Sequence, residues 1–99
     1  PTGLLVNGTD PGIAQAINKA VDAGIPTVVY DSDIPSKRHA FLGTDWYEVG
    51  RLQGEQMVQR IRGRGKVACL GILGMANQEA GFRGFRDVIR RYPAIEYLG

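Results

Sequence analysis

The apolar positions of this chain form two patterns, short continuous runs and repeats at helical spacing, and together they predict strands alternating with helices. Short apolar runs bounded by turn residues are typical of buried strands. None of these runs alternates with polar residues, which is expected where helices cover both faces of a sheet. The five expected strands lie at residues 3–6, 27–30, 40–43, 67–70 (extending toward 73) and 95–98.

Apolar residues recur at helical spacing in three segments between these runs. The first helix is expected at 11–23, with Thr9 or Asp10 as its cap, the second at 45–62 behind a capping box, and the third at 78–91. The positions expected to face the core are Ile13, Ala16, Ile17, Ala20 and Val21 in the first, Val49, Leu52, Met57 and Ile61 in the second, and Phe82, Phe85, Val88 and Ile89 in the third.

This order of elements predicts an α/β fold: a parallel sheet with helices on both faces, joined by right-handed crossovers, as in Rossmann-like domains. Ligands of such folds bind beyond the carboxyl ends of the strands. The loops that follow strands are therefore the places to look for function, and each contains polar side chains. They are residues 7–11, 31–35, 43–46 and 71–78.

Composition narrows the classes of function. The 99 residues are 43% hydrophobic and 22% charged, which is ordinary for one globular domain. No apolar run reaches the roughly 18 to 20 residues that a membrane-spanning helix needs. A single cysteine, Cys69, and a single histidine, His39, exclude an internal disulfide and a tetrahedral zinc site. Cys69 lies in an apolar run and is expected to be a small buried hydrophobic residue. We expect no catalytic residue, metal or cofactor.

The net charge is +2, and its densest basic stretch is residues 60–66. These arginines and the lysine fall at the end of a predicted helix, where cations complement the negative end of the helix dipole. Aromatic residues that would stack on bases are absent beside them. The stretch therefore favours a solvated helix end over a nucleic-acid interface.

The sharpest candidate site is Asp31-Ser32-Asp33, directly after a buried strand. Two carboxylates so close repel each other unless a cation, a metal or a polyhydroxylated ligand lies between them. The alternative is a turn in which Asp31 bonds the backbone of Asp33 and both carboxylates face water.

Amide side chains follow two other strands. Asn7 ends the first, and Asn77 and Gln78 lie in the loop before the third helix. Amides both donate and accept hydrogen bonds, which suits a neutral ligand with hydroxyl groups. Asn77 is also placed to cap the third helix, and the two roles are equally favoured.

An enzyme class also has a strand ending in Asp-x-Asp. The haloacid-dehalogenase-like phosphatases use the first aspartate as nucleophile and the second as acid/base. This chain is only partly similar to them, because Pro35 stands where that family has Thr or Val, and no later acidic pair is present to hold Mg²⁺. The departures disfavour a phosphatase.

Taken in order along the whole chain, several motifs resemble the sugar-binding proteins of ABC transporters, of the ribose-binding type. These proteins have the type I periplasmic binding protein fold, in which two α/β lobes close over a ligand. The motifs are Asn7-Gly8-Thr9-Asp10-Pro11, residues 16–26, Tyr30-Asp31-Ser32-Asp33, Leu42-Gly43-Thr44-Asp45 with Gly50-Arg51, and Gly65-Lys66-Val67.

The resemblance implies a middle portion of such a protein. Residues 1–44 would belong to the first lobe, residues 45–99 would begin the second, and the chain would cross the hinge near Thr44-Asp45. The resemblance also implies a location in the periplasm, or outside the cell on a lipid anchor in a Gram-positive organism. The signal peptide would lie outside this portion.

The resemblance further implies ligand contacts and partners. Asn7 and Asp31 match ligand-binding positions, and Ser32 stands where the ribose binder has a ligand-contacting arginine. Asp33 is implied as a contact by those binders whose corresponding strand also ends in Asp-Ser-Asp. The expected partners are a sugar or polyol, the ABC permease in the membrane and, for some members, a chemoreceptor. Gly81 stands where the family often has a ligand-clamping arginine, which favours a sugar-like molecule other than ribose.

A regulatory class shares this ancestry. The effector-binding core of lactose-repressor-like transcription factors has the same fold. Those repressors more often have a Gly-His-Arg/Lys turn where this chain has Gly65-Lys66-Val67, and an upstream DNA-binding helix-turn-helix would decide between the two. Transport is the favoured interpretation, and effector binding by a repressor is the alternative.

Overall fold

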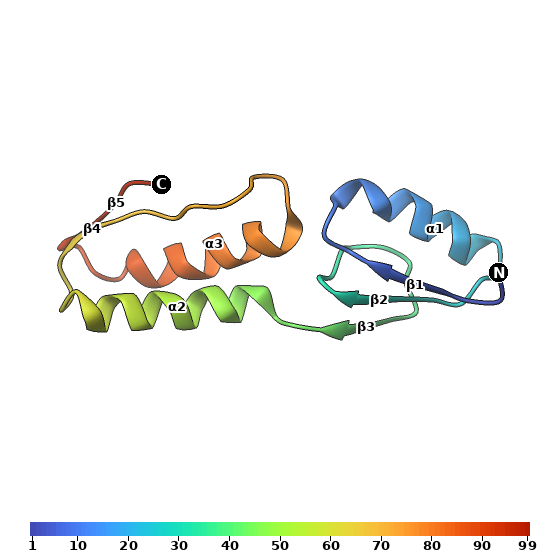
Figure 1. Cartoon of the computed structure of the whole chain (residues 1–99), viewed down its shortest axis with the longest axis horizontal. Coiled ribbons are helices and arrows are strands. Elements are labelled where there is room, and N and C mark those ends of the chain that lie inside the picture. Colours follow the sequence, from blue (N-terminus) through green and yellow to red (C-terminus); the bar gives the residue numbers. More distant parts are fainter. The chain divides into compact units, whose positions relative to one another are not determined.

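The computed structural model describes all 99 residues, which form five β-strands, three α-helices and one short 3-10 helix (Figure 1). The chain divides into two compact units. The first comprises residues 1–44 and 74–77, and the second comprises residues 45–73 and 78–99. None of the helices combines the length and the apolar character that crossing a membrane requires.

The first unit contains a three-stranded parallel sheet in the order β1 (Leu4–Asn7), β2 (Thr27–Asp31), β3 (Ala40–Gly43). The helix α1 (Ala14–Asp22) connects β1 to β2 and lies over one face of the sheet (Figure 1). The core between them is built on Ile17, which the helical pattern had predicted to face inward. On the other face of the sheet Leu5 and Leu42 are exposed, so residues 1–44 supply a helix for one face only.

Asp10, and not Thr9, caps the start of the first helical segment. Its carboxylate oxygen accepts a hydrogen bond from the amide of Gly12 at 2.9 Å. The chain then forms the 3-10 helix η1 (Pro11–Ile13), with proline at its first position, before α1 begins. Thr9, the other candidate for the cap, makes different contacts that involve the end of β1.

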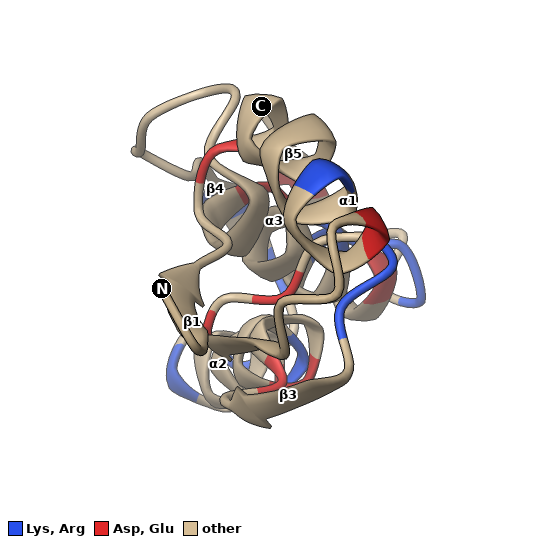
Figure 2. Cartoon of the chain, turned by 90° about the vertical axis from the view of Figure 1, so that its right-hand side faces the viewer, with Lys and Arg blue, Asp and Glu red and all other residues tan.

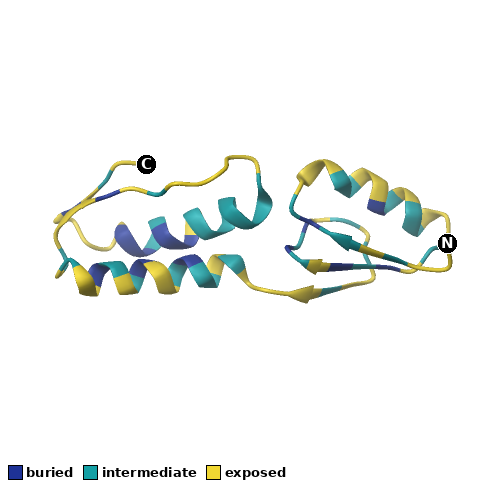
Figure 3. Cartoon of the chain, in the orientation of Figure 1, coloured by how far each residue is buried: buried dark blue, intermediate teal, exposed yellow.

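The second unit contains a two-stranded parallel sheet, β4 (Gly65–Val67) with β5 (Ile95–Tyr97), the helix α2 (Trp46–Arg60) and all but the first two residues of α3 (Ala76–Ile89). Asp45 caps α2, because its carboxylate accepts a hydrogen bond from the amide of Glu48 at 3.1 Å. Figure 2 shows that α2 carries residues of both charges, Glu48 in its first turn and Arg60 in its last among them. The apolar core gathers residues from both helices and both strands: Val58, Val67, Phe85, Val88, Ile89 and Ile95 (Figure 3).

The predicted apolar stripe of α2 is confirmed only in part. Met57 and Ile61 pack against the core of the second unit. Leu52 is 49% exposed, and the buried positions are Gly50, Gly54 and Val58. At Gly50 a Cβ atom would lie 1.9 Å from the carbonyl oxygen of Gly81 on α3. The two helices approach so closely that backbone packs on backbone, which apolar periodicity does not reveal because glycine carries no side chain.

The fourth strand is shorter and earlier than predicted. It ends at Val67, and the apolar residues Leu70, Ile72 and Leu73 beyond it are exposed. A strand persists only where a neighbouring strand pairs with it, and β5 is three residues long. Cys69, expected to be buried, is half-buried against the core of the second unit, and its amide donates to the carbonyl of Gly99 at 3.2 Å.

Candidate functional site

The last residue of β2, Asp31, has a backbone conformation that few residues other than glycine adopt. Its φ is +65°, and the amide of Ser32 donates to the carbonyl of Tyr30 at 2.8 Å, which closes a three-residue turn around it. Turns of this kind with a positive φ at the centre are rare and strained. Strained residues of this type persist only where the surroundings hold them, and they concentrate at functional sites.

Two glycines hold the turn from either side. A Cβ atom on Gly43 of β3 would lie 2.6 Å from the amide nitrogen of Asp31. A Cβ atom on Gly8, after β1, would lie 2.2 Å from the carbonyl oxygen of Ser32. Both distances are far below ordinary contact. The Asp31 turn therefore lies between two backbone segments that only glycine allows to come so close.

Asn7, at the end of β1, bonds directly to Asp31. Its side-chain nitrogen Nδ2 donates to Oδ2 of Asp31 at 3.3 Å. Its oxygen Oδ1 accepts from the amide of Thr9 at 2.9 Å and also from the Thr9 hydroxyl. The structure thus brings together two side chains that are distant in sequence, because β1 and β2 are parallel neighbours whose carboxyl ends meet.

Ser32 occupies a different environment from the one its sequence position implied. Ser32 is 1% exposed, and its backbone carbonyl packs against Gly8. A side chain with so little exposure offers little surface to a ligand. Ser32 is thus part of the packed base of the turn, and its contact with a ligand stays a prediction.

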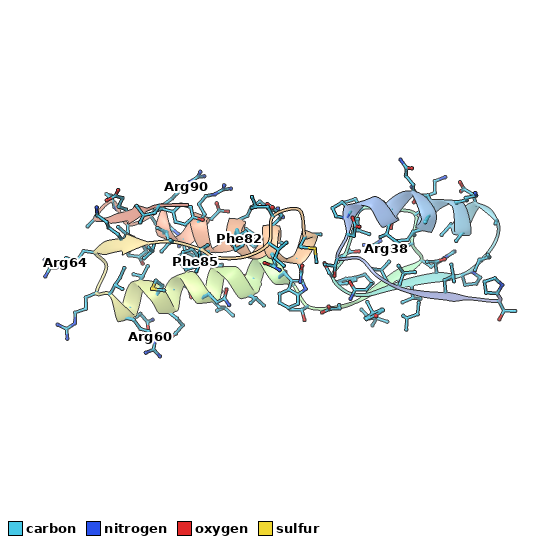
Figure 4. All side chains as sticks on the ribbon, turned by 45° about the horizontal axis from the view of Figure 1, so that its top comes forward. Arg38, Arg60, Arg64, Phe82, Phe85 and Arg90 are labelled. Atoms are coloured by element: carbon cyan, nitrogen blue, oxygen red, sulfur yellow. The ribbon has the colours of Figure 1, made fainter.

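The Asp33 carboxylate forms an ion pair with Arg38, which Figure 4 labels. The Arg38 nitrogens Nε and Nη2 donate to the two carboxylate oxygens, each at 2.6 Å. The hydrogen bonds from Arg38 hold the pKa of Asp33 below its ordinary value, with a further contribution from the Ile34 amide. Arg38, in the loop before β3, thus neutralises Asp33, and the sequence pattern gave no sign of this partner.

The same loop is tied to α1. The amide of Lys37 donates to Oδ1 of Asn18 at 2.7 Å, and its ammonium group pairs with Asp22 at 2.8 Å. These contacts and the Asp33–Arg38 pair hold residues 33–38 against the first unit. Asp33 therefore shapes the loop beside the candidate site, and its carboxylate is already bidentate to a guanidinium.

Asn77 does not cap the third helix. The helix begins at Ala76, so Asn77 is its second residue, and the expected capping role is wrong. The Oδ1 atom of Asn77 is buried without a hydrogen-bond partner. The amide of Ala76 donates to the carbonyl of Thr9 at 2.8 Å, which joins the segment 74–77 to the loop after β1 in the first unit.

Gln78 belongs to the second unit. Its Oε1 atom accepts a hydrogen bond from the amide of Ile72 at 2.7 Å. The amide oxygen of Gln78 thus holds the loop before α3, and the sequence position alone gave no sign of this contact.

The chemistry of the Asn7–Asp31 pair is that of hydrogen bonding to neutral polar groups. A carboxylate accepts from hydroxyl groups, and an amide nitrogen has a second hydrogen to donate. The chain contains no group of three or more His, Cys, Asp or Glu side chains placed to hold a metal ion.

Parallel α/β units with polar side chains at the carboxyl ends of their strands are the architecture of a ligand-binding protein. The chain matches the periplasmic binding protein domain family over residues 1–99, and it belongs to that family. The comparison with curated proteins found no match.

Several solved structures are similar to this chain. One is GanP, a glucose-galactose binding protein from Geobacillus stearothermophilus, with 34% identity and a TM-score of 0.92 over 98% of this chain and 36% of that one. The sugar-binding protein of a sugar ABC transporter from Bacillus halodurans is 38% identical, with a TM-score of 0.82 over 99% of this chain and 35% of that one.

A third similar structure is a complex. It is described as the XylFII-LytSN complex, and the matched chain is 32% identical with a TM-score of 0.88 over 98% of this chain and 37% of that one. This chain spans little more than a third of the length of each of these three structures. The likeness supports the type I periplasmic binding protein fold for these residues.

Proposed function

We propose that the protein carrying this chain is the solute-binding component of an ABC sugar transporter, located in the periplasm or outside the cell. It binds a sugar or polyol and performs no catalysis. The observation that carries the proposal is the Asn7–Asp31 pair at the carboxyl ends of adjacent strands. Family membership and the sugar-binding relatives add support.

The two compact units fit two lobes that close on a hinge. The division of the chain between Thr44 and Asp45 agrees with a hinge crossing at that point. Closure of the lobes over a sugar would exclude water and strengthen the hydrogen bonds to it. A ligand that binds the closed form better shifts the population toward it, and a partner protein can then recognise the loaded state.

Two kinds of partner follow from this function. The first is the membrane permease that receives the sugar. The second is a sensor protein, which the complex of the XylFII relative with LytSN favours. Sugar binding itself is common to both, so the direct test addresses the sugar.

The test is thermal melting of the complete protein that carries these residues, with a panel of hexoses, pentoses, deoxysugars and polyols. A bound sugar at 100 times its Kd should stabilise the protein by about 2.7 kcal/mol. Asp31→Asn should abolish the shift, and Asp22→Asn, which alters only an exposed ion pair, should preserve it. The proposal fails if no member of the panel raises the melting temperature.

A further inference from the structure

We infer that Thr9 is a positioning residue that orients the Asp31 carboxylate through Asn7. The inference rests on the proposed function, because it matters to the extent that Asp31 contacts a sugar. Thr9 was predicted as a helix cap and plays no part in capping α1. Its hydroxyl and its amide instead both contact the Oδ1 atom of Asn7.

The chemistry of these contacts fixes which way the Asn7 amide faces. A backbone N–H can only donate, so the atom of Asn7 that lies 2.9 Å from the Thr9 amide must be the oxygen. The Thr9 hydroxyl contacts the same oxygen. The amide nitrogen is therefore turned toward Asp31, where it donates to the carboxylate at 3.3 Å. Rotating the Asn7 amide by half a turn would place two donors against each other.

Thr9 is itself held in place. Its carbonyl accepts a hydrogen bond from the amide of Ala76 at 2.8 Å. The preceding residue, Gly8, is buried against the carbonyl of Ser32. We call the hydrogen bonds from Thr9 to Asn7 and from Asn7 to Asp31 the relay. The relay is anchored at Thr9, and its other end is the strained turn that bears the Asp31 carboxylate.

An anchored relay prepares the site before a ligand arrives. A side chain that is already ordered loses less conformational freedom on binding, and this raises affinity without any new ligand contact. One hydrogen of the Asn7 amide is used on Asp31, and the other is available to a sugar hydroxyl. Thr9 therefore influences two ligand-binding groups while its own hydroxyl is committed to Asn7.

The variants that separate this role from simple packing are Thr9→Val and Thr9→Ser. Valine keeps the shape of threonine and loses the hydroxyl, whereas serine keeps the hydroxyl and loses the methyl group. The backbone bonds of Thr9, to Asn7 and to Ala76, survive in both. Thr2→Val is a matched control, because Thr2 is exposed near the start of the chain.

The first measurement is the affinity of the complete protein for the panel sugar that raises its melting temperature most. Loss of one positioning hydrogen bond should weaken binding about tenfold in Thr9→Val. Thr9→Ser should bind within about threefold of the unmodified protein, as should the Thr2→Val control. Equal affinity of Thr9→Val and the unmodified protein would overturn the inference, as would equal loss in Thr9→Val and Thr9→Ser.

A second measurement does not depend on sugar binding. Crystal structures of the sugar-free Thr9→Val and Thr9→Ser proteins report the distance between Nδ2 of Asn7 and Oδ2 of Asp31. The Asn7 amide of the valine variant keeps only the backbone bond from Thr9, so we expect this distance to lengthen in Thr9→Val and to stay unchanged in Thr9→Ser. An unchanged distance in Thr9→Val refutes the relay, whereas a lengthened one in a protein that binds no panel sugar refutes only the proposed function.

Discussion

Gly43 lies opposite Asp31 in the pairing of β3 with β2, and a Cβ atom on Gly43 would be 2.6 Å from the Asp31 amide nitrogen. The residue that the proposed function needs most is thus in a strained conformation and is enclosed by a neighbour without a side chain. The enclosure explains why the strain persists, since the surrounding backbone leaves the turn little room to relax.

Replacing Gly43 with alanine should therefore disturb the candidate site. The added methyl group meets the Asp31 backbone, which cannot rotate away, and we expect a loss of about 1–3 kcal/mol in the free energy of unfolding. Urea denaturation of the complete protein measures it. Gly3→Ala is the matched control, because its Cβ atom would meet nothing nearer than the Pro26 carbonyl oxygen at 3.7 Å. Similar stability of the two variants would contradict the close approach of β3.

The positive φ of Asp31 predicts that glycine at this position gives a more stable protein than alanine does, although neither variant binds the sugar. Asp31→Gly relieves the strain of the left-handed conformation, and it should be more stable than Asp31→Ala by about 1–2 kcal/mol. Both variants lack the carboxylate, so neither should bind the panel sugar. Parallel urea melts and calorimetric titrations give the two quantities. If Asp31→Ala proved as stable as Asp31→Gly, the turn would not be strained.

The close contact between α2 and α3 predicts opposite effects on stability for two glycine-to-alanine substitutions. Alanine in a helix normally gains about 0.8–1 kcal/mol over glycine. Gly81→Ala should show this gain, because its Cβ atom would lie 3.7 Å from the nearest oxygen, that of Trp46. Gly50→Ala should instead destabilise the protein, since its Cβ atom would lie 1.9 Å from the Gly81 carbonyl oxygen. Thermal melting of both variants measures the effect. Melting temperatures that shift in the same direction would contradict the close backbone contact.

The Asp33–Arg38 pair predicts a contribution to stability that depends on pH. The pair holds the pKa of Asp33 below its ordinary value of 3.8. The contribution is therefore fully present above pH 3.8 and is lost as the pH falls below 3.8 through the folded-state value. Because both side chains are partly exposed, it should not exceed about 1 kcal/mol.

The measurement is the free energy of unfolding between pH 6 and pH 2.5 for the unmodified protein and Asp33→Asn. The difference between them should shrink on acidification. Arg38→Gln removes the same pair from the other side and should show the same reduced acid sensitivity. A difference that stays constant down to the lowest pH would exclude the ion pair as its source.

Much of the fold was determined by the sequence itself. The apolar runs predicted four of the five strands to within a residue at each end, and the cap at Asp45 predicted the start of α2 to within a residue. These signals are local: a cap, a proline at a first helical position and a continuous apolar run each act through a few neighbouring residues. The position of Asp31 at the end of a strand was predicted in the same way.

The remaining features needed the tertiary structure, because they depend on residues that only the fold brings together. The close contact of Gly50 with Gly81 buries glycine positions of α2 that carry no apolar side chain, and pairing with the short β5 limits the length of β4. The partner of Asp33, the burial of Ser32 and the bonds from Thr9 to Asn7 were likewise absent from the sequence pattern. Sequence periodicity records which side chains avoid water, whereas backbone approach, strain and the choice of hydrogen-bond partner are set by distances that exist only once the strands and helices are packed.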